Sequence, residues 1–136
     1  MKRLVVAAVA AMVLGVLAFS GFAQKATKEA MRKKLDYAQG VLEGLTLQKF
    51  ELALTNAVLL RDMSHTNVFA LLRNPDYLAS STNFSRAVDG LVSAAKSQDL
   101  ERATEAYTRV TLSCVQCHEQ FRREQFMKAQ EKAAAK

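Results

Sequence analysis

Apolar residues recur at a helical period along the chain after residue 23, and no segment shows the strict alternation of a strand. Between residues 25 and 45 the apolar positions fall at 4-3-4-3 spacing, which predicts one inward stripe on a helix. A similar stripe predicts a second helix, capped by Thr46 and ending near residues 61–64. The two stripes comprise Met31, Leu35, Ala38, Leu42 and Leu45, and then Leu47, Phe50, Leu54, Ala57 and Leu60.

The segment 74–76, Asn-Pro-Asp, interrupts this pattern. Proline cannot continue a helix and restricts the residue before it, so residues 74–82 are predicted to form a loop. Ser81 or Thr82 is then expected to cap a third helix. The predicted inward residues of that helix are Phe84, Ala87, Leu91 and Ala94.

A short turn at residues 97–99 separates the third helix from a fourth, for which Asp99 is a good N-cap. The tail from Lys128 lacks a wide apolar face and is expected to fray. The inward stripe of the fourth helix is the clearest in the chain, and it comprises Ala103, Tyr107, Val110, Cys114, Cys117 and Phe121.

Four amphipathic helices with short or moderate connections predict an all-α fold, an antiparallel four-helix bundle. The chain of 136 residues fits one domain, which we expect to span residues 24–136. There is no internal repeat and no low-complexity linker after residue 23.

The first 23 residues have the layout of a signal peptide. After a basic start, the apolar run Leu4–Phe19 leads to small residues at Gly21 and Ala23. An uncleaved membrane anchor is the alternative, because residues 4–23 are just long enough to span a bilayer. The small residues favour cleavage after Ala23, which predicts an exported, periplasmic bacterial protein without stable membrane insertion.

The charge of the remaining chain is modest. Without the two basic residues of the leader, 17 Lys and Arg stand against 13 Asp and Glu, which leaves a net charge of +4. The cations form no stripe and no aromatic-interleaved patch, so we expect no nucleic-acid partner.

The chemistry of the sequence is concentrated at Cys114-Val115-Gln116-Cys117-His118. The pattern C-x-x-C-H is the attachment signature of haem c. Each thiol adds to one vinyl group on the porphyrin edge, and the two intervening residues set the sulfurs at the separation of those vinyls. The histidine that follows is carried beneath the ring, where its imidazole can bind iron. The motif therefore predicts one covalent haem with His118 as an axial ligand.

Other interpretations of the two cysteines are weaker. Redox-active C-x-x-C motifs normally lie near a βαβ pattern, and none is present in this sequence. A disulfide three residues apart in a helix closes only a tiny loop and stabilises little. A zinc site lacks ligands, since the only other histidine is His65 and there is no second cysteine pair.

The second axial ligand has four candidates. Met127 lies on the same helix as His118, His65 is expected to be exposed, and Met63 is expected to be core. Met31 lies on the first inward stripe and is the preferred ligand, although such methionines are more often core filler. The side chains expected to surround the haem are Leu35, Tyr107, Val110 and Phe121, with Lys28 among the cations that would meet the propionates.

The C-x-x-C-H motif near the end of the last helix of an exported helical chain resembles the class II c-type cytochromes, the cytochrome c-prime family. The resemblance covers about Lys25 to Arg123 and includes Arg122, one turn after the histidine, where the family commonly carries a basic residue. Met31 is similar to the family's first-helix position that faces the iron, which is methionine in low-spin members. High-spin members tend to carry arginine one turn earlier, where this chain has Thr27.

This resemblance implies two functions. With Met31 on the iron, the protein is an electron carrier that works with redox partner proteins and turns over no substrate, so it is not an enzyme. With Met31 off the iron, the site is five-coordinate and takes nitric oxide or carbon monoxide. A haem-free interaction module with a disulfide is the third alternative. Family members often dimerise through their first two helices, and no patch in this sequence decides whether this chain forms a homodimer.

Overall fold

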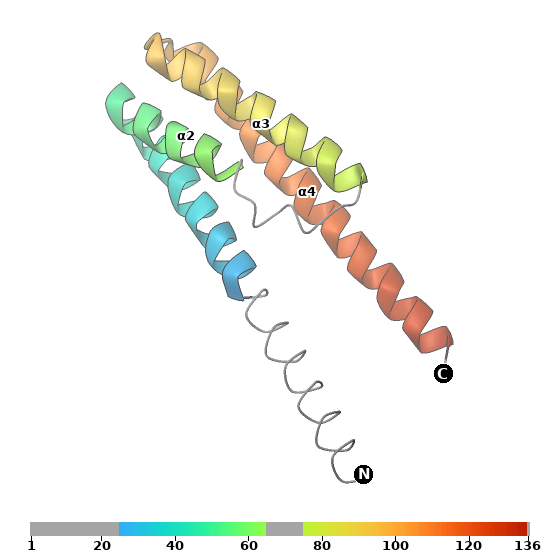
Figure 1. Cartoon of the computed structure of the whole chain (residues 1–136). Coiled ribbons are helices and arrows are strands. Elements are labelled where there is room, and N and C mark those ends of the chain that lie inside the picture. Colours follow the sequence, from blue (N-terminus) through green and yellow to red (C-terminus); the bar gives the residue numbers. More distant parts are fainter. Residues whose placement is uncertain (1–24, 65–74, 136) are drawn as a thin grey trace, which may run out of the picture.

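The computed structural model describes residues 25–64 and 75–135, and within them the chain forms four helices and no strand. The first helix covers residues 25–46, followed by α2 (Phe50–Ser64), α3 (Pro75–Lys96) and α4 (Leu100–Ala134). The first helix and α2 lie antiparallel, as do α3 and α4, and α2 also contacts α3 (Figure 1). The predicted all-α, antiparallel four-helix bundle is confirmed.

The core runs along the axis of the bundle, and small side chains make up much of it. Because alanine and valine leave short side chains at the helix contacts, the four backbones can approach one another closely. The buried cluster comprises Val41, Leu45, Ala53, Ala57, Leu60, Phe84, Val88, Leu91, Ala94, Ala103, Ala106 and Val110.

Two matching turns close the same end of the bundle (Figure 1). In the first, the N–H of Gln48 donates to Leu45 O and that of Lys49 to Gly44 O; in the second, Gln98 donates to Ala95 O and Asp99 to Ala94 O. Gln48 and Gln98 have φ of 53° and 56°, the left-handed conformation that ends a helix in a Schellman motif. We call this end, with residues 44–53 and 94–103, the closed end.

The predicted turn at residues 97–99 and the N-cap of α4 are confirmed. A side-chain oxygen of Asp99 accepts a hydrogen bond from the backbone N–H of Arg102 at 3.0 Å. This bond satisfies one of the amide groups that a helix leaves unpaired at its start.

The predicted role of Thr46 is wrong. Its hydroxyl donates back to the carbonyl oxygens of Leu42 and Glu43, so it completes the last turn of the first helix and does not cap α2. Leu47, predicted on the inward stripe of α2, lies in the turn and is 54% exposed.

The predicted loop at residues 74–82 is wrong from residue 75 onward, because α3 already begins at Pro75. Proline is well tolerated at the first helical position, since its missing N–H would have no intrahelical partner there. Thr82 does not cap the helix; its hydroxyl donates to Leu78 O inside it. At the other end of the chain, α4 continues past Lys128 to Ala134, and the fraying of this tail stays a prediction.

The inward face of the first helix is rotated from the predicted stripe. Leu35 and Leu42 are 49% and 46% exposed, so the prediction that they point inward is wrong. Ala30 and Val41 are buried instead, whereas Leu45 of the predicted stripe is buried as predicted. Leu35 and Leu42 were assigned by apolarity alone, whereas this part of the helix turns its smaller residues toward its close neighbours.

Candidate functional site

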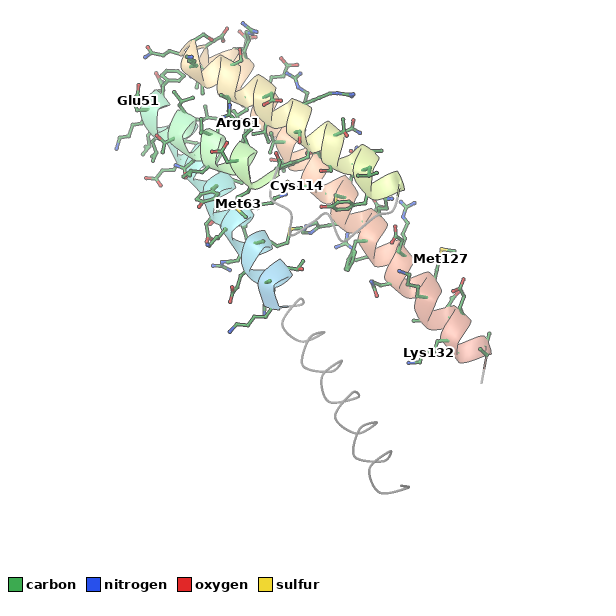
Figure 2. The ribbon with its side chains drawn as sticks, in the orientation of Figure 1. Glu51, Arg61, Met63, Cys114, Met127 and Lys132 are labelled. Carbon is green, nitrogen blue, oxygen red and sulfur yellow. The ribbon has the colours of Figure 1, made fainter. Side chains whose placement is uncertain are left out.

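The two cysteines lie on the half-buried side of α4, one turn apart. Cys114 packs against the core cluster, and Cys117 lies further from the closed end. Both sulfurs are free thiols. Figure 2 shows Cys114 about midway along α4, and Met127 further toward the end of the chain. The three-residue spacing on a helix is what places both sulfurs on the same side.

A cavity of about 550 Å³ opens beside these cysteines, at the end of the bundle away from the two turns. It lies between the beginning of the first helix, the first turn of α3 and the second half of α4. We call this end the open end. The cavity is lined by Thr27, Met31, Tyr77, Cys117, His118, Gln120, Phe121, Arg122, Glu124, Gln125 and Lys128.

The cavity brings together several of the residues singled out by the sequence, namely Met31, Cys117, His118, Phe121 and Arg122. His118 and Arg122 are separated by one turn of α4, and Met31 comes from the first helix.

Other predicted pocket residues lie elsewhere. Val110 is 1% exposed within the core cluster, and Tyr107 packs against that cluster. Lys28 and Leu35 are exposed and do not line the cavity. Cys114 lies one turn closer to the closed end than Cys117, which is the first lining residue of α4.

Among the described residues that line the cavity, Met31 is the only methionine. Met63 lies half-buried in the last turn of α2, and Met127 is 60% exposed. His65, the remaining candidate ligand, lies outside the described residues.

Burial is the main cause that raises the pKa of both thiols, and Cys114 lies at the edge of the core. The ammonium of Lys34 opposes this rise, and Glu124 adds to it for Cys117. Because burial is the larger cause in each case, both cysteines are neutral thiols at neutral pH. The protonated thiol is the less reactive form of cysteine, since the thiolate is the nucleophile.

Sequence reasoning missed the inward position of Lys34. Lys34 was one of the cations around Met31 that were expected either to meet the haem propionates or to form a solvated face, but its Nζ lies 4.5 Å from the centroid of the Phe84 ring. Burial lowers the pKa of Lys34, while nearby Cys114 and Cys117 act to raise it. The register of the buried residues Ala30 and Val41 could have revealed its inward position, since 30, 34 and 41 share one helix face.

Tyr77 was also missed, because its segment was predicted as a loop. It lies in the first turn of α3 and lines the cavity. Burial, and secondarily the proximity of Cys117, raises its pKa to about 12. Its phenol is therefore protonated across the physiological range.

A hydrogen bond fixes the start of α3 against α4 beside the cavity. The hydroxyl of Ser80 donates to Oε1 of Gln120 at 2.9 Å, and Gln120 itself lines the cavity. This contact joins residues 40 apart in the chain and positions Tyr77 over the second half of α4.

Glu124 was predicted to be solvated surface, but it is half-buried in the cavity lining. Glu119 does lie on the surface, where it pairs with Arg123. The hydrogen bond and charge of Arg123 lower the pKa of that carboxyl.

The donor set fits covalent haem and an iron atom. Two neutral thiols one turn apart suit addition to two vinyl groups, and the adjacent imidazole and the thioether of Met31 are both iron ligands in haem proteins. The cavity volume falls within the range of about 300–1,000 Å³ usual for small-molecule sites. Within residues 25–64 and 75–135, no group of three or more His, Cys, Asp or Glu side chains forms a separate metal site. No helix in those same ranges is long and apolar enough to cross a bilayer.

Comparisons with known proteins agree with this site. A family sequence model described as "Cytochrome C'" matches residues 67–122, which include both cysteines and His118. No curated protein matches the chain.

Solved structures with the same fold include cytochrome c' from Rubrivivax gelatinosus, which is 19% identical. The match covers 68% of this chain and 88% of that one, with a TM-score of 0.58. Two nitric oxide complexes from Alcaligenes xylosoxidans are similar, a leucine-to-alanine and a leucine-to-isoleucine mutant of cytochrome c prime. Both are 18% identical to this chain, and each match covers 71% of this chain. The matches cover 92% and 93% of the two mutant chains, with TM-scores of 0.56 and 0.55.

Proposed function

We propose that this chain is a cytochrome of the c-prime family with one covalent haem c, and that its iron site takes up nitric oxide or carbon monoxide. The observation that carries this proposal is the cavity of about 550 Å³ that adjoins His118 and Cys117. The nitric oxide complexes among the similar structures support the same class of ligand.

Each residue of the attachment motif has a role in this proposal. Cys114 and Cys117 would form the two thioethers, with each thiol proton passing to the vinyl carbon that does not bind sulfur. His118 would donate an imidazole nitrogen to the iron. When bound, haem supplies an iron with an axial position that can be left open to a diatomic gas.

The side chains around the cavity would control access and polarity. Met31 and Phe121 supply apolar surface, which suits a neutral diatomic ligand better than water. Arg122 lies one turn after His118 in the same lining, where its guanidinium can pair with a carboxylate of the cofactor. Tyr77 brings a hydroxyl that stays protonated and can donate a hydrogen bond.

A second candidate function is electron transfer with Met31 as the sixth ligand. The observation that favours it is that Met31, on the first helix, lines the same cavity as His118 on α4. Coordination by Met31 would fill the axial position and leave no room for a gas. The two candidates therefore differ in one measurable property, the occupancy of that position.

The test is an absorption spectrum of the haem-loaded protein, ferric and ferrous, followed by titration of the ferrous form with carbon monoxide. We expect a broad high-spin spectrum and carbon monoxide binding by the wild type. Met31→Ala should speed that binding by enlarging the cavity, whereas Met63→Ala, which alters a methionine outside the lining, should leave it unchanged.

A sharp low-spin ferrous spectrum and refusal of carbon monoxide by the wild type would contradict gas binding. If Met31→Ala then converted that spectrum to high spin, electron transfer through Met31 would be the function.

Export is part of the same proposal, since haem c is attached outside the cytoplasm. We expect cleavage after Ala23 and a periplasmic protein of residues 24–136. The mass of the protein purified from periplasm checks this, and a mass that includes residues 1–23 would contradict cleavage.

A further inference from the structure

Lys34 brings a cation to the face of the first helix that packs against the rest of the bundle. It follows Met31 by one turn and shares a helix face with the buried residues Ala30 and Val41. Its Nζ lies over the ring of Phe84, at 4.5 Å from the ring centroid, and that ring is only 7% exposed. Lys33, its neighbour in sequence, is exposed.

Phe84 belongs to the core cluster against which Cys114 packs, so the Lys34 ammonium and Cys114 adjoin the same cluster. Cys114 and Cys117 are the residues that would carry the porphyrin edge, and the charge of Lys34 opposes the rise in pKa that burial gives both thiols. Burial lowers the pKa of Lys34 itself. Thioether formation would leave both sulfurs permanently neutral, and the negative charge of a thiolate could not then arise beside the ammonium.

We propose that Lys34 is a positive charge beside the haem attachment site, which favours the reduced over the oxidised iron and favours anionic over neutral ligands. This inference rests on the haem site of the proposed function. Lys34 would act through its charge and not as a ligand, and it is therefore a tuning residue.

The physical basis is Coulomb interaction in a medium less polar than water. The oxidised site carries one more positive charge than the reduced site, so a fixed cation nearby raises the free energy of the oxidised form. Reduction adds one electron from an external one-electron donor, with no bond or proton changing at Lys34. An anion such as azide gains attraction to the ammonium, whereas carbon monoxide carries no charge and gains nothing.

The experiment compares Lys34→Met, Lys34→Gln and Lys34→Arg in the haem-loaded protein, with Lys33→Met as the matched control for an exposed cation. The first readout is the reduction potential, measured with redox mediators. We expect both neutral variants to reduce the ferrous-to-ferric ratio at a given potential about tenfold. For a one-electron couple that is a shift of about 59 mV toward lower potential.

The second readout is ligand affinity. We expect the ferric neutral variants to bind azide about tenfold more weakly than the wild type, while ferrous affinity for carbon monoxide stays within about twofold. Lys34→Arg, which keeps the charge, and Lys33→Met should resemble the wild type in both measurements.

Potentials of the Lys34→Met and Lys34→Gln proteins equal to that of Lys33→Met would overturn the inference. So would a Lys34→Arg protein that shifts as far as the neutral variants, because the effect would then come from packing. A wild type that refuses carbon monoxide would end the gas-binding proposal but leave this one standing if the potentials shift as expected.

Discussion

The closed end and the open end of the bundle are built from different materials. At the closed end, two Schellman turns and a core of alanine, valine and leucine hold four helices at close range. At the open end, polar and ionisable side chains from the first helix, α3 and α4 surround a cavity. The contrast indicates that the protein gains its stability at one end and places its chemistry at the other.

The largest expected effect comes from loss of the haem, which should change the stability of the open end and leave that of the closed end unchanged. In the double variant Cys114→Ala/Cys117→Ala, covalent haem attachment should be abolished, and the open end should lose an occupant that contributes to its packing. Amide hydrogen exchange should then speed up around Met31, Tyr77 and Phe121 and remain slow near Leu45, Leu91 and Ala103.

The mass of the purified double variant checks the loss of haem, and exchange of the loaded wild type is the reference. Uniformly faster exchange at both ends would show that the closed end also depends on the cofactor, and the contrast between the ends would fail.

A smaller effect tests the close packing of the closed end. A Cβ added to Gly44 would lie 2.5 Å from the backbone nitrogen of Ala53 in α2, and backbone cannot move aside as a flexible side chain can. We therefore expect Gly44→Ala to lower the free energy of unfolding by about 1–3 kcal/mol, the range for overpacked cores. Denaturant unfolding measures it.

Gly90 is the matched control, because nothing lies within 4 Å of a Cβ added there. In the helix interior of α3, Gly90→Ala should stabilise the protein by about 0.5–1 kcal/mol through helix propensity. Equal effects of the two substitutions on the free energy of unfolding would show that the first helix and α2 can move apart without loss of stability.

The smallest effect concerns the start of α4. Asp99→Ala removes the acceptor of the 3.0 Å bond from Arg102 N–H and should destabilise the fold by about 1 kcal/mol. Asp99→Asn, which keeps an acceptor oxygen, should recover most of that loss in the same unfolding measurement. A neutral outcome for Asp99→Ala would mean that water satisfies the amide as well as the carboxylate does.

The half of the closed end that joins α3 and α4 was predictable from the sequence, whereas Thr46 and Leu47 in the other turn were predicted wrongly. The turn at residues 97–99, the Asp99 cap and the inward positions of Leu91, Ala94 and Ala103 follow from local preferences and a single helical period. The attachment motif and the Met31 position were also singled out in advance, and the structure places Met31, Cys117 and His118 around one cavity.

The open end was predicted less well, for physical reasons that differ from residue to residue. Pro75 signals a break, but the same missing N–H also suits the first position of a helix, so local sequence allows both outcomes. Because residues 74–82 were predicted as a loop, Tyr77 was not recognised as a residue of the cavity. Lys34 was expected either to meet a haem propionate or to lie on a solvated face, yet a long side chain can bury its methylene groups and direct its ammonium to a partner from another helix. Such partners are set by tertiary packing.

The position of the two Schellman turns gives the bundle geometric leverage. Both lie at the closed end, and α3, with 22 residues, is roughly 33 Å long at 1.5 Å per residue. A change of about 2° in the angle between two such helices at their turn displaces their far ends by roughly 1 Å. Substitutions at Gln48 or Gln98 would therefore change the width of the cavity from the opposite end of the bundle, by changing the angle between the helices that each turn joins.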